Sequence, residues 1–412
     1  MIFFSARKPL TMTFFGESYA LEPLTHPEIN PDHILAAPNG LGHSIVNRHR
    51  QHLQIIDFEA DRIPGFPRRL MQNPADLPVG TRIIMLRDAG IGDALTMTPI
   101  IAHLNKLDNR VLPVLATLKD RHELFAGTGC PLLPLPIRLS QLLGQADFFI
   151  DFHDPKDICE KVEMIDFNFD SLNIDPRTIP SEQKIPSLAP EIASSDNIRT
   201  RIDSLTREFL IRILYAPGAS DQLRVLPDVI LKKLALTYPD IAFISTDSGS
   251  EPIAKNVFSL ETSESLRAFI TAIDHCDGVV SSDSSAYHLA AALGRAALAI
   301  FGPVPSSIRS GYYPKVVALD AAYQGQTCHS PCMIHGHLFR NAGIPIGREG
   351  IRQLKAGTPI TTFSGSTFTY DPEKGCPEMN CCDTPNSPCL MNISDAALLP
   401  SFEKLLELLE KT

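Results

Sequence analysis

Several features are missing from this sequence of 412 residues, and each absence excludes a class of protein. It has no tryptophan and no apolar run near the roughly 18 residues of a membrane span. Its N-terminus, MIFFSARKPLTMTFF, lacks the continuous apolar core of a signal peptide. Positive charge is scarce, since 37 Lys and Arg face 47 Asp and Glu and give a net charge of −10. We therefore expect a cytoplasmic protein with no transmembrane segment and no nucleic-acid partner.

The length and composition indicate a globular protein of two or three domains. Hydrophobic residues make up 44% and charged residues 20%, and 34 prolines predict many loops. Residues 1–80 predict an N-terminal extension, small and β-rich, without a strong helical period. Residues 81–190 and 191–393 predict two α/β domains, joined by a linker at 176–195, and residues 394–412 a C-terminal helix.

Apolar runs alternate with helical periods through both α/β domains, which predicts parallel sheets covered on both faces. Two doubly wound halves would place a ligand cleft between the carboxyl ends of their strands. Strands are predicted at 82–87, 111–117, 146–152, 211–216, 241–246, 277–282 and 296–301. Helices are predicted at 93–106, 226–238, 264–276, 284–293 and 394–411.

Glycine patterns exclude one class of nucleotide-binding protein. No G-x-G-x-x-G follows the first strand of the α/β region, which argues against a nicotinamide-dependent dehydrogenase. Gly40-Leu41-Gly42-His43 has neither a clear strand before it nor a clear helix after it. These four residues therefore predict a turn rather than a phosphate loop.

The first motif with chemical potential follows the strand at 82–87. Gly90 and Gly92 allow a tight turn and the close approach of a ligand, and Asp93 opens the next helix. Asp93 is a candidate general base at the cleft. An equally good interpretation is that Asp93 only caps its helix.

The second motif, Pro-Gly-Ala-Ser at 217–220, lies between a predicted strand and helix. Gly218, the Ser220 hydroxyl and Arg224 make a candidate anion site that fits a diphosphate. Taken alone, an ordinary loop with a solvated arginine is as good an interpretation.

The third motif follows the strand at 277–282. Asp283, Ser284 and Ser285 lie where a small-residue helix begins, and His288 is on that helix. Asp283 can accept hydrogen bonds from sugar hydroxyls, and Gly302 follows the next strand in Phe-Gly-Pro-Val-Pro. We interpret these residues as a donor-binding set rather than as helix packing alone.

In order and spacing, the three motifs resemble the ADP-heptose heptosyltransferases of glycosyltransferase family 9. The resemblance rests on G-I-G-D at 90–93, P-G-A-S at 217–220, R-V-L-P at 224–227 and D-S-S-A-Y-H-L-A-A-A-L at 283–293. F-G-P-V-P at 301–305 completes it. This chain departs from the family pattern at three positions, where Leu226 replaces Trp, Ser285 replaces Gly and Val304 replaces Thr.

The resemblance implies a GT-B fold, in which two Rossmann-like doubly wound domains face a cleft and the last helix packs back on the first domain. It implies inverting transfer of a sugar, heptose, from a nucleotide-diphosphate donor such as ADP-heptose, without a catalytic cofactor. Asp93 would be the base and Arg224 the cation on the diphosphate. Gly90, Gly92, Gly218, Ser220, Asp283, Ser284, Ser285, His288 and Gly302 would contact the donor.

The acceptor is left open by these residues. A hydroxyl of a bacterial glycan, of lipopolysaccharide or of a protein would each fit, and a lipid-linked acceptor would bring the enzyme to the inner membrane. A catalytically inert binding or assembly protein of the same shape is the alternative, favoured by the three departures and opposed by the intact Asp93, Arg224, Asp283 and His288. An epimerase of the same fold has no support from the motifs.

Cysteines divide into two groups. Cys130, Cys159 and Cys276 lie in apolar surroundings and predict inert buried thiols. Six more crowd the C-terminal quarter, in a Cys-rich insertion at 328–389 with a strand-forming segment, TPITTFSGSTFTY, that predicts a hairpin-like finger. The related subgroup that glycosylates autotransporters carries an iron-binding cysteine finger. We expect a structural zinc or iron site built from Cys328, Cys332, Cys376 and Cys382 or Cys389, with His335 and His337 in reserve. An equally good interpretation is a set of free or loosely buried thiols without metal.

Overall fold

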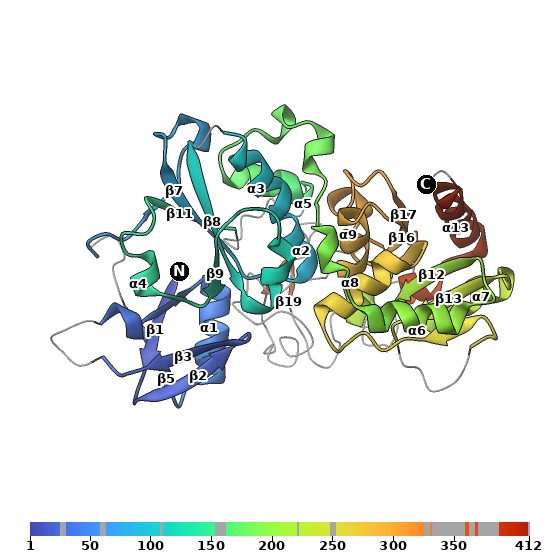
Figure 1. Ribbon diagram of the computed structural model, residues 1–412, viewed down its shortest axis with the longest axis horizontal. Helices are drawn as coiled ribbons and strands as arrows, with labels where there is room; N and C mark the ends of the chain where they lie inside the picture. Colours follow the sequence, from blue (N-terminus) through green and yellow to red (C-terminus); the bar gives the residue numbers. More distant parts are fainter. Residues whose placement is uncertain are drawn as a thin grey trace. The chain divides into compact units, whose positions relative to one another are not determined.

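The computed structural model divides the chain into two compact units, Met1–Ala189 and Pro190–Thr412 (Figure 1). Each unit is described by itself below. The structure describes residues 1–24, 30–57, 63–107, 110–152, 162–220, 222–247, 253–324, 330–331, 359–361, 367–369 and 387–410.

The first unit is built around a five-stranded parallel sheet with the order β6-β11-β7-β8-β9. The run TRIIMLR at Thr81–Arg87 forms the central strand β7, and every residue in it except Arg82 is buried. The chain leaves β7 toward β8 on one side and returns as β11 on the other, so the sheet reverses its direction of growth between β7 and β11. The other strands are β6 (Arg68–Arg69), β8 (Val111–Leu118), β9 (Leu132–Leu135) and β11 (Phe148–Asp151).

The helix predicted at 93–106 forms as two helices, α2 (Ile91–Leu95) and α3 (Met97–Asn105). Thr96 separates them, and its hydroxyl donates to the carbonyl oxygen of Asp93 at 2.6 Å. Helix α3 packs on β8 and on α5 (Met164–Ser171). The break fixes the short helix α2 at the carboxyl end of β7.

The N-terminal segment contains the expected β-structure together with a helix that the sequence analysis missed. Strands β4, β1 and β5 form an antiparallel sheet, extended at one edge by β10 from later in the chain, and β2 and β3 form a hairpin. Their bounds are β1 Ile2–Ala6, β2 Leu10–Phe14, β3 Glu17–Leu21, β4 Leu35–Ala37, β5 Leu53–Ile56 and β10 Ile137–Arg138.

The turn predicted at Gly40–His43 is wrong, because these residues lie within helix α1 (Asn39–Arg48). Packing against β1 explains why position 42 is a glycine. A Cβ at Gly42 would lie 2.7 Å from the Cβ of Ile2, so the missing side chain lets α1 approach β1 closely. The glycine therefore serves helix–strand packing, which local sequence does not distinguish from a turn.

The predicted linker is packed rather than loose where it belongs to the first unit. Short 3-10 turns at Pro176–Thr178 and Ser181–Lys184 replace regular structure. The Lys184 side chain is 5% exposed, and its ammonium lies 2.6 Å from the Asp166 carboxylate on α5. A buried pair of this kind holds the segment to the body of the first unit.

The second unit is a six-stranded parallel sheet with the order β14-β13-β12-β15-β16-β17. In chain order this is 3-2-1-4-5-6, the Rossmann arrangement, with its switch point between β12 and β15. The strands predicted in this half are confirmed. Their bounds are β12 Ile211–Ala216, β13 Ile241–Ser245, β14 Val257–Ser259, β15 Gly278–Ser282, β16 Ala296–Phe301 and β17 Val316–Asp320.

Helices of the second unit also lie where the periodicity predicts them. The C-terminal helix buries Leu398, Phe402 and Leu405 and packs against β15, β16 and β17. A contact of this helix with the first domain stays a prediction. The helices are α6 (Asp196–Thr206), α7 (Asp228–Thr237), α8 (Leu266–His275), α9 (Ser285–Ala292), α12 (Pro388–Met391) and α13 (Asp395–Leu409).

The segment predicted as a finger forms an antiparallel pair, β18 (Pro359–Thr361) with β19 (Thr367–Thr369). Cys130 and Cys276 are buried free thiols, as expected, and burial raises the pKa of the Cys130 thiol to about 11. Cys159 lies outside the described residues. Among the described helices, none has the length and apolar character needed to cross a membrane.

Candidate functional site

The switch point of the first unit presents Asp93. Gly90 is the N-cap of α2 with extended backbone angles, and the N–H of Ala94 donates to its carbonyl oxygen at 2.9 Å. Asp93 lies in the first turn of α2 with a 41% exposed side chain. Its Oδ2 lies over Gly90, 3.5 Å from the place a Cβ would occupy there. The carboxylate thus lies at the carboxyl end of β7 and is open to a ligand.

Arg87 is a site residue that the sequence analysis did not single out. It ends β7, is 6% exposed, and donates from one guanidinium nitrogen to the carbonyl oxygen of Phe152 at 2.8 Å. A second nitrogen lies 3.5 Å from Oδ1 of Asp93. Arg87 therefore ties the end of β7 to the chain beyond β11 and places a buried positive charge beside the candidate base. An arginine ending an otherwise apolar strand is the signal that could have revealed it.

The switch point of the second unit brings the second and third motifs together. Arg224, at the end of the 3-10 turn Gln222–Arg224, donates to the Ser220 hydroxyl at 2.7 Å and to the Asp283 carbonyl oxygen at 2.8 Å. The same guanidinium lies 3.5 Å from the Asp283 carboxylate. The Ser282 hydroxyl donates to the Gly218 carbonyl oxygen at 2.9 Å and so links the end of β15 to the loop that follows β12. The cation is thus held in place before any ligand arrives.

Asp283 is more deeply engaged than the sequence analysis expected. Only 3% of the residue is exposed, and its carboxylate accepts from the Tyr287 hydroxyl at 3.5 Å in addition to facing Arg224. Ser284 follows as the N-cap of α9, its hydroxyl 3.3 Å from that of Ser281. Asp283 therefore positions Arg224, and its predicted contact with the donor sugar stays a prediction.

His288 lies on α9 and is 5% exposed. Its Nδ1 is 2.8 Å from the Tyr313 hydroxyl, and its ring lies 4.1 Å from that of Tyr287, measured between centroids. Neither tyrosine was singled out from the sequence. Together they fix the orientation of the imidazole.

Two glycines of the predicted donor set differ in what surrounds them. A Cβ at Gly218 would meet nothing within 4 Å, so open space lies above this loop. A Cβ at Gly302 would lie 3.0 Å from Leu390 and 3.1 Å from the Cys389 sulfur. Packing of α12 therefore accounts for Gly302, and its donor contact stays a prediction.

The cysteine site falls mostly outside the described residues. Cys328, Cys332, Cys376 and Cys382 are not among them, nor are His335 and His337. Cys389 is described: it is buried in α12, and burial raises the pKa of its thiol. Within the described ranges, no three or more His, Cys, Asp or Glu side chains gather as metal ligands do.

These features define an α/β protein of two doubly wound halves, each with polar loops at its switch point. Residues 252–337 match the sequence model of glycosyltransferase family 9 (heptosyltransferase). This match agrees with the resemblance drawn from the motifs and places it in the second unit. No curated protein sequence matches the chain.

Heptosyltransferases are among the solved structures that are similar to this chain. ADP-heptose LPS heptosyltransferase II of E. coli is 12% identical, covers 80% of this chain and 99% of its own, and superposes with a TM-score of 0.51. A second similar structure is that of TibC, the dodecameric iron-containing heptosyltransferase of enterotoxigenic E. coli H10407, in complex with ADP-D-β-D-heptose. It is 14% identical, the match covers 81% of this chain and 78% of the TibC chain, and the TM-score is 0.50. The expected GT-B fold is confirmed.

Proposed function

We propose that this glycosyltransferase transfers heptose from ADP-heptose to an acceptor hydroxyl of a bacterial glycan, lipopolysaccharide or protein, with inversion at the sugar carbon. The observation that carries the proposal is the prearranged cluster of Arg224, Ser220 and Asp283 at the switch point of a Rossmann sheet. A diphosphate is a ligand that suits such a cluster. TibC, with the same fold, binds ADP-D-β-D-heptose.

In the proposed mechanism Asp93 removes the proton of the acceptor hydroxyl as its oxygen attacks the sugar carbon. The bond from that carbon to the diphosphate breaks on the opposite side, and Arg224 stabilises the negative charge that gathers on the departing diphosphate. Arg87 places a positive charge 3.5 Å from Oδ1 of Asp93. Single displacement with a base and a cation requires no metal in the chemical step.

A thermal-shift screen of the purified chain against ADP-, GDP-, UDP- and dTDP-sugars tests the donor. A ligand that binds only the folded state raises the melting temperature. We expect the largest rise with ADP-heptose. A larger rise with another nucleotide sugar would replace the proposed donor. If none of the nucleotide sugars raised the melting temperature, the catalytically inert protein of the same shape would be favoured.

Gly218 and Gly302 make a matched pair of variants. Gly218→Ala is expected to keep the melting temperature, because its new Cβ points into open space, and to weaken donor binding about tenfold, because that space is where the diphosphate would lie. Gly302→Ala is expected to lose about 1–3 kcal/mol of stability by overpacking against Cys389 and Leu390. Calorimetry and thermal melts measure both. If Gly302→Ala weakened donor binding and Gly218→Ala lowered only the melting temperature, the proposed diphosphate site at Gly218 would be wrong.

We also propose a structural zinc or iron bound by the late cysteines, with Cys389 as one ligand. Its thiol lies beside Ser330, which is two residues from both Cys328 and Cys332 in sequence. A bound cation would also offset the cost of ionising a buried thiol. Elemental analysis of untagged protein should find about one metal per chain. Less than about 0.2 per chain, without chelators or oxidation, would remove the site.

Chelation should lower the melting temperature, because a structural metal stabilises only the folded chain. Its effect on turnover at a temperature where the protein stays folded should be small.

A further inference from the structure

The parallel sheet of the first unit is covered only in part on one of its faces. Side chains of Leu86, Ala116 and Leu135 on that face are buried under the N-terminal sheet and α4 (Leu139–Leu142). Toward the opposite ends of the strands the cover by described residues thins: Ile84 is still buried, while Leu112 on β8 is 40% exposed. Parallel sheets normally have both faces covered, so a half-face that the described residues cover incompletely can take an occupant.

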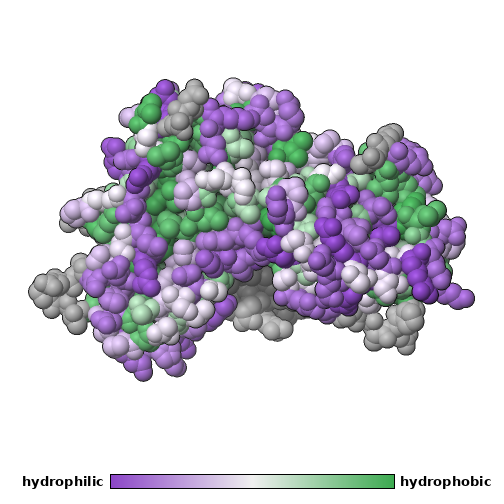
Figure 2. Space-filling view, viewed as in Figure 1, coloured by the Kyte–Doolittle hydropathy of each residue, from purple (hydrophilic) through white to green (hydrophobic). Residues whose placement is uncertain are grey.

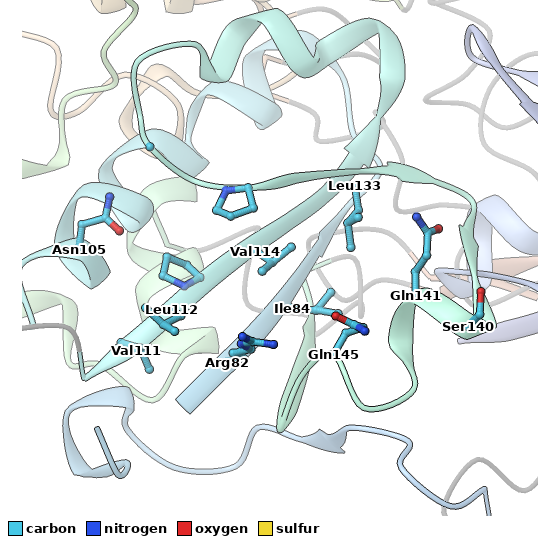
Figure 3. A pocket seen from close by; sticks show the side chains of 13 residues that line it. Arg82, Ile84, Asn105, Val111, Leu112, Val114, Leu133, Ser140, Gln141 and Gln145 are labelled. Carbon is cyan, nitrogen blue, oxygen red and sulfur yellow. The ribbon is translucent and has the colours of Figure 1, made fainter. Parts of the chain in front are cut away.

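This half-face is the floor of a groove of about 820 Å³. Ile84, Leu112, Val114 and Leu133 project from the three strands into it (Figure 3). Figure 2 shows the corresponding hydrophobic surface over β7 and β8. The volume lies within the usual range for a ligand site.

Carboxamides line the rim of the groove. Gln141 and Gln145 stand on one side together with Ser140, and Asn105 stands at the far end (Figure 3). Gln141 is already oriented, because its Oε1 accepts from the backbone N–H of Arg138 at 3.1 Å. Carboxamides both donate and accept hydrogen bonds, so the rim suits an occupant that brings donors and acceptors at close spacing.

Arg82 supplies the charge of the groove. Its backbone pairs with Asp147, while within the described part of the chain its exposed guanidinium has no ionic partner. A second cavity of about 660 Å³ shares Arg82 and Gln145 with the groove and is also lined by Arg68 and Asp147. On a chain with a net charge of −10, this local excess of positive charge favours a carboxylate at that end.

The groove is remote from the candidate base. Arg82 and Arg87 stand five residues apart on β7, about 16 Å at the rise of a strand, and Asp93 lies beyond Arg87. An occupant of the groove therefore does not compete with the reacting groups, and its binding does not depend on the proposed transfer reaction.

The lining discriminates between classes of ligand. No aromatic ring is among the described residues that line the larger cavity, which disfavours nucleobases and sugars. An acyl chain would bury the carboxamides without hydrogen-bond partners, which is unfavourable. An extended polypeptide meets both demands, since its backbone pairs with the carboxamides and every second side chain points to the aliphatic floor.

We propose that this groove binds an extended polypeptide segment with aliphatic side chains at alternate positions and a carboxylate that pairs with Arg82. The segment would belong to a partner protein of the enzyme. Binding here would hold that partner on the first unit.

A labelled seven-residue peptide tests the proposal, with valines at its first, third and fifth positions, glutamate at the seventh and serines between. Fluorescence anisotropy with the full chain should show saturable binding. Leu112→Ser and Arg82→Glu should each weaken it about tenfold, and Arg82→Glu should instead prefer the peptide with lysine in place of glutamate. Leu236→Ser, which alters a leucine on α7 that is 63% exposed against 40% for Leu112, is the control and should change nothing.

Three results would overturn the proposal. The first is no binding at about 1 mM peptide, and the second is binding unchanged by both groove variants. The third is displacement of the peptide by dodecanoate at equal affinity, which would assign the groove to an acyl chain. Binding of ADP-heptose, measured on the same variants, should stay unchanged, so a failure here is distinct from a failure of the proposed transfer reaction.

Discussion

Replacing Asp93 by asparagine is expected to slow sugar transfer by about 10²–10⁴-fold, the usual contribution of a general base. Asparagine keeps the shape of the side chain and its place in the first turn of α2, but its amide cannot accept the acceptor's proton. Radiometric or coupled turnover assays measure the loss. Donor affinity should stay within about twofold, because the donor loops belong to the other unit.

Asp76→Asn is the matched control for this change. Asp76 is an exposed carboxylate in the same unit, in the 3-10 turn Pro74–Asp76, and the variant should keep full activity. If Asp93→Asn retained more than a few per cent of wild-type turnover, Asp93 would be a helix-terminal charge and the base would have to be sought elsewhere.

Arg224→Ala is expected to weaken donor binding and to lower turnover further, by about 10²–10³-fold. The guanidinium is held by Ser220 and Asp283, so its charge is in place before the diphosphate leaves. Charge on the diphosphate is greater in the transition state than in the ground state, and the loss should therefore fall more on kcat than on binding. Calorimetry with ADP and with ADP-heptose, together with turnover, separates the two.

Two further variants make this test specific. Arg224→Lys keeps the charge but cannot hold both loops at once, so its turnover should lie between wild type and alanine. Arg212→Ala removes a cation of the same unit that pairs with Asp203 at 2.7 Å, and it should leave both measurements unchanged. Normal binding of both ligands by folded Arg224→Ala would exclude Arg224 from the site. A melting curve is part of the test, because Asp283 loses its buried partner.

Much of the fold was predictable because its signals are local. Strands β7, β12, β15 and β16 are short, mostly buried apolar runs followed by turn residues. A short apolar run that ends in turn residues is typical of a buried strand. Helix α13 has a single apolar stripe. By contrast, α1 was missed because its Gly42 serves a close contact with Ile2, which only the tertiary structure reveals.

Pairings over long sequence distances account for what the sequence could not predict in the site. Arg87 meets Phe152 65 residues away, and Tyr313 meets His288 from beyond the next strand. The motif residues themselves were predictable, because glycines, serines and charges cluster at strand ends. The contact of Arg224 with Asp283 depends on β12 and β15 being neighbours, and that follows from the sheet order alone. The groove on β7 and β8 has no local signal.

The most direct test of the account is transfer itself. Purified chain is incubated with ADP-heptose labelled in the sugar and with an extract of bacteria that cannot make heptose, and label in the macromolecular fraction is counted. The account predicts incorporation by wild type, loss of incorporation with Asp93→Asn, and release of ADP in equal amount. Tight binding of ADP-heptose without incorporation or ADP release would contradict it and identify a binding protein with the shape of a glycosyltransferase.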